Sequence, residues 1–212
     1  MKEQYPLAYR YLKSRKETIT DKVKHNSGEY WHTYTREHNH DSFESAKIIV
    51  PMTTKETYAT FVSDRGLYMD NSNVWFLNYR GSNAKVMKAL TMIINSTLFS
   101  VFGKCGANPA SNGYYKFNKQ FLEPIPLPNR QISPSNDYIK QLARLYDEVK
   151  ALLEEYDKAN ENDRKSYRNM MESKWQAVDD CCMELYEIEK DERMLINSIG
   201  RVESRVPGGD EE

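Results

Sequence analysis

A segment with proline at every second position constrains the fold of this chain more than any other feature. In Glu123-Pro124-Ile125-Pro126-Leu127-Pro128 the prolines alternate with other residues, most of them apolar. Each proline fixes its own φ angle and biases the residue before it away from helix, so the segment must run extended. Helix and strand patterns both precede it, whereas only helix patterns follow it. We therefore expect one domain over residues 1–130 and a helical part over 131–200.

The first part has the pattern of an α+β fold. Apolar residues recur at helical spacing over residues 5–24 and more densely over 83–102, which predicts a long buried helix. Between them, short β-branched and aromatic runs are separated by turn residues. These runs predict a small antiparallel or mixed sheet with strands at 47–52, 58–62, 66–69 and 73–79. The buried helix should pack on this sheet.

The second part has the pattern of an α-helical hairpin. The run Ser135-Asn136-Asp137 can cap a helix that extends to about Tyr156. A second helix, about 164–186, has an apolar stripe at spacings of 4, 3, 4 and 3 that is typical of a helix seam, formed by Met171, Trp175, Val178, Cys182 and Leu185. A short helix follows at 191–199. We expect the acidic tail, 201–212, to be disordered.

The charge is divided unevenly along the chain. Residues 1–130 carry 18 Lys and Arg against 11 Asp and Glu, so 18 − 11 = +7, and residues 131–212 carry 12 against 20, so 12 − 20 = −8. Such asymmetry favours contact between the first part and a polyanion. An uneven surface without function would give the same numbers, and that alternative stays open.

Composition and cysteine usage favour a cytoplasmic protein. No stretch approaches the roughly 18 apolar residues that span a bilayer, and the first ten residues lack the apolar run of a signal peptide. Three cysteines, Cys105 and the adjacent Cys181 and Cys182, suit a reducing compartment, because neighbours rarely bridge each other. We interpret the adjacent pair as buried apolar groups. Cys105 has no base nearby in the sequence that would make it a nucleophile.

The sequence has no recognisable catalytic motif. Glycine-rich nucleotide loops and the Gly-x-Ser-x-Gly motif of hydrolases are both missing from it. His32, His38, His40 and Asp41 form the one cluster that could bind a metal, but no cysteine and no helical spacing supports it. We therefore expect no catalytic residue, no bound cofactor and no metal in this chain.

Two loops of the basic part, 25–47 and 104–119, combine basic residues with polar aromatics. Lys and Arg neutralise phosphates, Asn can pair with adenine in the major groove, and tyrosine hydroxyls bind the backbone. This mixture fits duplex DNA better than a membrane surface, which favours a basic amphipathic helix. By chemistry and loop position, the candidate DNA contacts are Arg36, Lys47, Arg80, Lys104, Asn112, Tyr114, Lys116, Asn118 and Lys119. The alternative for the aromatics at 114–117 is a strand with one face in the core.

Several segments, in this order and spacing, resemble the TaqI-type C-terminal specificity domain. This is the target-recognition domain of adenine-N6 DNA methyltransferases and of fused restriction-modification enzymes. The resemblance runs from about Tyr5 to Ile199, and two segments carry most of it, Asn95-Ser96-Thr97-Leu98-Phe99 and the run from Gly113 through Tyr115-Lys116-Phe117-Asn118 to Pro128. Further matches are the segments 5–12, 47–51 and 183–192. Lys116 stands where the family often has arginine, which keeps the charge but loses a bidentate fork.

The resemblance implies sequence-specific recognition of duplex DNA without chemistry in this part. The family's catalytic Asn/Asp-Pro-Pro-Tyr/Phe motif and cofactor loop are not in the sequence. We therefore interpret the chain as a specificity fragment that positions a target adenine for a catalytic methyltransferase domain of the parent enzyme. The cofactor of that domain would be S-adenosylmethionine, and the context would be bacterial defence. Cleavage of DNA by the parent is left open.

Three alternatives remain at this point. The first is a fragment of the specificity subunit of a multi-subunit restriction-modification system, although such subunits usually carry two recognition domains in tandem. The second is a protein-interaction module that uses the acidic helical hairpin. The third is a small metal-dependent nuclease built on the histidine cluster.

Overall fold

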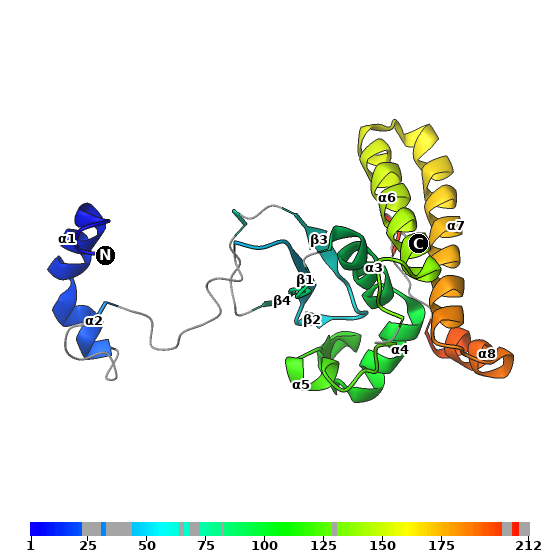
Figure 1. Cartoon of the computed structure of the whole chain (residues 1–212), viewed down its shortest axis with the longest axis horizontal. Coiled ribbons are helices and arrows are strands. Elements are labelled where there is room, and N and C mark those ends of the chain that lie inside the picture. The colour runs from blue at the N-terminus through cyan, green and yellow to red at the C-terminus, as the bar shows by residue number, and fades with distance from the viewer. Residues whose placement is uncertain are drawn as a thin grey trace. The chain divides into compact units, whose positions relative to one another are not determined.

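The computed structural model describes residues 1–22, 31–32, 44–63, 66–67, 73–81, 83–128, 131–200 and 205–207. The chain divides into two compact units, Met1–Ser42 and Phe43–Glu212. In the first unit, α1 (Pro6–Ser14) is followed directly by α2 (Lys16–Lys22) (Figure 1). The sequence predicted a single helix here. The helix is interrupted at Arg15, whose N–H bonds back to Leu12 at 2.9 Å.

Two small antiparallel sheets belong to the second unit. The first has the order β3-β1-β4, with strands Thr60–Val62, Lys47–Pro51 and Val74–Leu77. The second has the order β2-β6-β5, with strands Thr53–Thr54, Tyr115–Lys116 and Asn108–Pro109. Three of the predicted strands are confirmed in shortened form. In the fourth, 66–69, residues 66–67 are not in a strand and residues 68–69 lie outside the described residues. The second sheet was not predicted.

The segment predicted as one long buried helix forms two helices, α3 (Ala84–Ile94) and α4 (Thr97–Gly106), which meet at 64°. Asn95 is the reason for the break. Its side chain accepts from the N–H of Ala59 at 2.6 Å and donates to the Ala59 carbonyl at 2.9 Å. These are the two hydrogen bonds that the backbone of a paired strand would make with Ala59. Ser96 then caps α4, because its Oγ accepts from the N–H of Phe99 at 3.2 Å.

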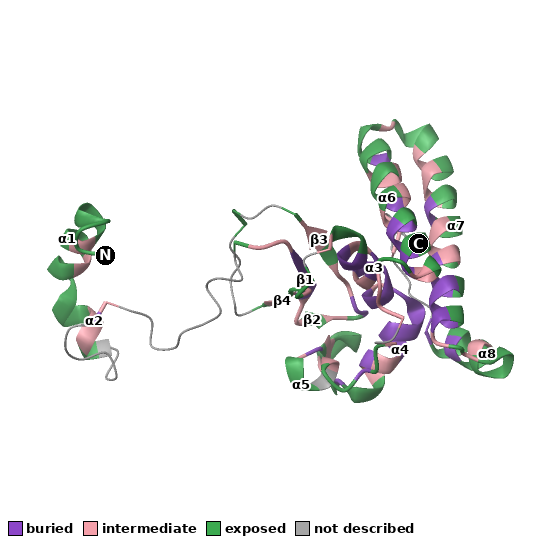
Figure 2. Ribbon diagram, viewed as in Figure 1, coloured by how far each residue is buried: buried purple, intermediate pink, exposed green. Residues whose placement is uncertain are grey.

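The helical hairpin is confirmed. It consists of α6 (Asp137–Lys158) and α7 (Glu161–Leu185), and α8 (Lys190–Ile199) follows. Asn136 caps α6 through the N–H groups of the next turn. Figure 2 shows the buried residues of α6 and α7 on their facing sides, as the predicted seam requires.

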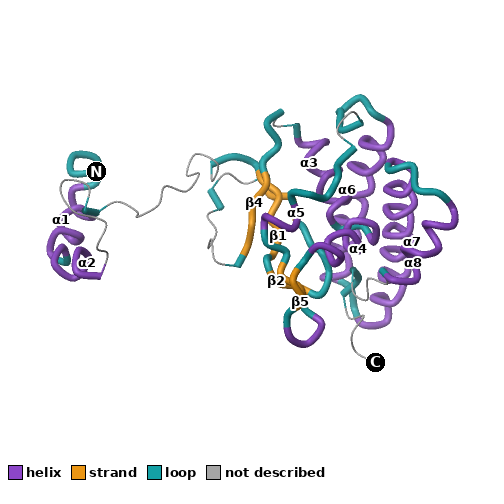
Figure 3. The backbone as a smooth tube through the Cα atoms, turned by 90° about the horizontal axis from the view of Figure 1, so that it is seen from below, coloured by secondary structure: helices purple, strands orange, loops and turns teal. Residues whose placement is uncertain are grey.

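One hydrophobic core crosses residue 130, where the sequence suggested a boundary. Ile48 of β1, Val86 of α3, Ile139 of α6 and Val178 of α7 all belong to it, and each is at most 1% exposed. Figure 3 shows the strands of this unit gathered to one side of its helices. The hairpin and the sheets of the second unit therefore fold together.

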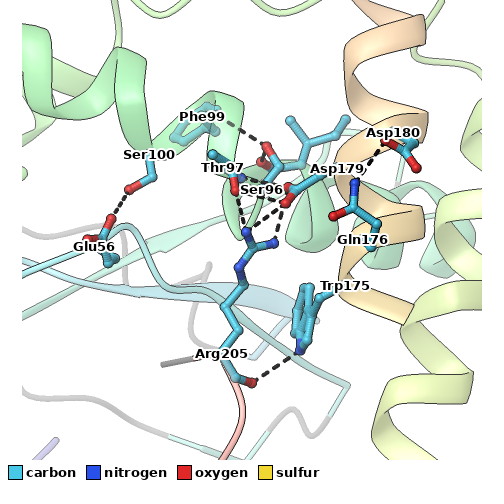
Figure 4. A network of polar contacts seen from close by, with 11 residues as sticks. Glu56, Ser96, Thr97, Phe99, Ser100, Trp175, Gln176, Asp179, Asp180 and Arg205 are labelled. Atoms are coloured by element: carbon cyan, nitrogen blue, oxygen red, sulfur yellow. Dashed lines mark hydrogen bonds and ion pairs between the residues drawn. The ribbon is translucent and has the colours of Figure 1, made fainter. Parts of the chain in front are cut away.

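A polar network ties the start of α4 to α7 and to part of the predicted disordered tail (Figure 4). Asp179 accepts from the N–H and the hydroxyl of Thr97, both at 2.8 Å, and forms an ion pair with Arg205 at 2.7 Å. Arg205 also donates to the Thr97 hydroxyl, and its carbonyl accepts from the indole of Trp175 at 3.1 Å. Residues 205–207 are therefore held in place by the fold.

Within the described ranges, no single helix is long and apolar enough to cross a membrane. The bent pair of α3 and α4 meets that test only when the two are taken together, by length and composition. Most residues of both helices are buried.

Candidate nucleic-acid interface

The second sheet displays a row of polar side chains on one face. Lys116 in β6 lies opposite Thr53 of β2 on one side and Asn108 of β5 on the other. Directly opposed residues of antiparallel strands point to the same face of a sheet. All three side chains are exposed. We refer to Thr53, Lys116 and Asn108 as the exposed row.

The side chains on the other face of β6 point towards the protein interior. Phe117 is completely buried, its N–H donates to the Met52 carbonyl at 2.8 Å, and its carbonyl accepts from the Trp75 indole at 2.9 Å. Tyr115, which points the same way, is half-buried, whereas Tyr114 is 40% exposed. The strand alternation that we weighed for these aromatics thus holds, with Phe117 in the core and Tyr114 outside.

A tight turn before β6 presents two of the predicted contacts. Asn112 and Gly113 have φ angles of 58° and 74°, in the left-handed region that asparagine and glycine tolerate best. The turn is closed by the N–H of Ala110, which donates to the Tyr114 carbonyl at 2.7 Å. Asn112 and Tyr114 are therefore exposed beside the end of the exposed row.

After β6 the chain enters α5 (Lys119–Leu122), with Asn118 at its N-cap position. Lys119 forms an ion pair with Glu123 at 3.2 Å, and both side chains are about two-thirds exposed, at 66% and 64%. Such surface pairs contribute little and are easily exchanged for another anion. Lys119 is thus accessible to a phosphate, and Asn118 is partly exposed.

In two of the predicted basic contacts the ammonium group is bound to an acceptor within the protein. Lys47 is completely buried, and its Nζ donates to the Leu67 carbonyl at 2.8 Å. Lys104 lies on α4, its side chain is 21% exposed, and its Nζ is 2.5 Å from the Glu56 carboxylate. Both lysines stabilise the fold in this arrangement. We therefore leave them out of the proposed interface.

Two further predicted residues are not part of this surface. Arg80 is exposed in the turn after β4, which belongs to the first sheet. Arg36 lies outside the described residues, as do His38, His40 and Asp41 of the histidine cluster. In the part of the chain that the structure describes, no three His, Cys, Asp or Glu side chains could hold a metal ion together.

Thr53 and Asn108 belong to this surface but were not predicted as contacts from the sequence. Each lies in a strand of two residues, which is too short for any hydrophobic period to appear. The sequence predicts a loop at Asn108-Pro109. The available signal was the Thr53-Thr54 pair, because β-branched residues favour strands.

The burial of the three cysteines predicts which of their thiols react. Burial raises the pKa of the Cys181 thiol to about 12 and raises the pKa of the Cys182 thiol further, whereas Cys105 is exposed. Because the thiolate is the reactive form, we expect Ellman's reagent to modify Cys105 alone at pH 8. All three thiols should react in guanidinium chloride, and a Cys105→Ser variant should be inert until it unfolds. Fast labelling of three thiols in the native chain would contradict this assignment.

The same pKa shifts predict that the folded state loses stability at alkaline pH. The folded state holds the protons of Cys181 and Cys182 above the ordinary thiol pKa of 9, at which the unfolded chain releases them. The stabilising contribution of Cys181 is therefore complete below pH 9 and is lost as the pH rises from 9 to about 12, whereas that of Cys182 is lost over a range that extends to higher pH.

A known protein family matches more than half of the chain. No curated protein matches the chain. The family model described as the TaqI-like C-terminal specificity domain matches residues 2–127, which include β1 to β6 and the exposed row. Since this match spans more than half of the chain, the protein belongs to the family of TaqI-like C-terminal specificity domains.

Proposed function

We propose that this chain recognises a specific sequence in duplex DNA on behalf of an adenine-N6 DNA methyltransferase or a restriction-modification enzyme. The observation that carries the proposal is the exposed row on the second sheet. One lysine, one amide and one hydroxyl stand side by side on three neighbouring strands, and the buried ring of Phe117 follows the central strand, β6. Family membership supports a role in specificity.

The chemistry of this surface suits nucleic acid. The amides of Asn108 and Asn112 can form two hydrogen bonds with an adenine edge in the major groove. Lys116 suits a guanine edge or a phosphate, while the hydroxyls of Thr53 and Tyr114 suit backbone oxygens. Lys119 adds a second exposed cation on the next element. The surface thus offers groups for reading bases and groups for holding the backbone.

The methyl transfer itself is assigned to a separate catalytic domain, which would bind S-adenosylmethionine. The glycines near the exposed row do not fit a cofactor loop. An added Cβ on Gly103 would stand 3.0 Å from the Phe117 ring and 3.1 Å from Thr57, so this glycine serves packing, and Gly113 lies in an open turn. The role proposed for this chain is to hold the target adenine in register for extrusion into that domain, in the cytoplasm.

Replacing Lys116 with methionine should remove one cation from the DNA complex. We expect the slope of log K against log salt to become shallower by about 1, and the affinity at low salt to fall. The measurement is fluorescence anisotropy with a labelled random duplex between roughly 50 and 200 mM salt. Lys165→Met is the matched control, because Lys165 is an exposed lysine on α7. Equal slopes for K116M and the wild type would exclude Lys116 from the interface.

Selection of bound duplexes from a random library tests the specificity directly. The proposed function requires enrichment of a defined site by the wild-type chain. Asn108→Ala should relax one position of that site, at a cost of about 1–3 kcal/mol in discrimination. A wild-type chain that binds no duplex at low salt would overturn the proposal in favour of a protein-interaction module.

A further inference from the structure

An ion pair between Lys104 and the buried Glu56 lies against the second sheet. The Glu56 side chain is 9% exposed, and one carboxylate oxygen lies 2.5 Å from Lys104 Nζ. The other oxygen accepts from the Ser100 hydroxyl at 2.5 Å. The carboxylate is therefore paired and hydrogen-bonded, which a buried charge requires.

This pair connects α4 to two strands of the second sheet. Glu56 follows β2 closely, and its carbonyl accepts from the Thr54 hydroxyl at the end of that strand. Lys104 Nζ lies 5.7 Å from the centre of the Tyr115 ring in β6, within the range of a cation–π contact. The ring of Phe117, two residues after Tyr115, packs on Gly103 beside Lys104. The ion pair thus holds β2 and β6 in one orientation on α4.

We infer that Lys104 and Glu56 are positioning residues, which fix the second sheet so that its exposed row meets DNA in a single geometry. Lys104 is not a phosphate contact in this account. The part of this inference that concerns DNA rests on the proposed function. The attachment of the sheet to α4 can be measured without DNA.

The direction in which Glu56→Gln changes the DNA affinity distinguishes a positioning role of the ion pair from a direct phosphate contact by Lys104. If Glu56 merely neutralised a lysine that binds phosphate, Glu56→Gln would release that lysine and strengthen DNA binding. If the pair positions the sheet, Glu56→Gln leaves Lys104 without its carboxylate and weakens binding. Because the Glu56 carboxylate is buried and bound to Ser100 and Lys104, its substitution removes no exposed group that DNA could contact.

The experiment compares E56Q, K104M, the double variant and K104R in the full chain. We expect E56Q and K104M each to weaken binding to a random duplex by about tenfold without a change in the salt slope, since no phosphate contact is lost. The double variant should be no weaker than either single variant, because the two residues act as one unit. K104R should bind within about twofold of the wild type, because arginine keeps the ion pair and the contact with Tyr115.

Hydrogen exchange of the free chain supplies the second readout. Amides of β2, β5 and β6, including the Phe117 N–H, should exchange about tenfold faster in E56Q and K104M, while those of α6 and α7 stay protected. Stronger DNA binding by E56Q, a salt slope lowered by about 1 in K104M, or unchanged exchange in the sheet would each overturn the inference. If the wild type binds no DNA but the sheet exchanges faster in both variants, the proposed function fails and the structural attachment stands.

Discussion

Asp179→Ala is expected to lower the free energy of unfolding by about 3–5 kcal/mol, because it breaks a buried ion pair and leaves a guanidinium without its partner. Asp179 is 7% exposed, and its carboxylate joins three segments of the chain. It accepts from the N–H and hydroxyl of Thr97 at the start of α4, and from Arg205 beyond α8. The substitution would release all of these donors at once.

Urea unfolding followed by tryptophan fluorescence measures this effect. Asp179→Asn should fall between the wild type and D179A, because an amide oxygen still accepts from Thr97 but carries no charge. Asp180→Ala is the matched control: Asp180 is exposed on the same helix and accepts only from Gln176 among the described contacts, so its loss should change stability by less than about 0.5 kcal/mol. A D179A variant within about 1 kcal/mol of the wild type would show that the network contributes little.

The helical hairpin could be predicted from the sequence because its information is local. Asn136 caps the helix that follows it immediately, and the stripe from Met171 to Leu185 repeats within one element. A long apolar period of this kind identifies a helix even where single residues depart from the pattern. The prediction therefore matched the structure to within a few residues.

The break between α3 and α4 could not be predicted, because its cause is distant in the sequence. The apolar period continues through Asn95 and Ser96 without interruption. The side chain of Asn95 is committed to Ala59, 36 residues earlier. Thr97, two residues later, is held by Asp179, 82 residues further on. Tertiary partners of this kind decide where a helix ends.

The same distinction explains which of the predicted site residues are exposed. Tyr114 and Lys116 were predicted from their own chemistry within one short segment, and both are exposed. Lys47 and Lys104 carry the same charge as Lys116, but their partners, Leu67 and Glu56, lie 20 and 48 residues away. A lysine in a basic segment therefore gives no sign of whether its ammonium faces solvent or a buried acceptor.

Phe117→Ala is expected to lower the free energy of unfolding by about 3–5 kcal/mol, because it empties a completely buried aromatic site. It should also abolish sequence discrimination on DNA. The ring of Phe117 fills the space between Gly103 and Tyr115, so its loss removes the support behind β6. The exposed row would then keep its side chains but lose its fixed orientation, and preorganised contacts are the ones that discriminate.

Tyr114→Ala separates these two effects, since Tyr114 lies three residues earlier but is 40% exposed. It should leave stability within about 0.5 kcal/mol of the wild type while weakening DNA binding, whereas Phe117→Leu should lose less stability than F117A because leucine refills part of the site. Unfolding curves and anisotropy titrations on the same samples give both quantities. If F117A kept full discrimination while folded, the geometry of β6 would not determine recognition. If Y114A lost stability without losing affinity, its exposed ring would belong to the fold and not to the interface.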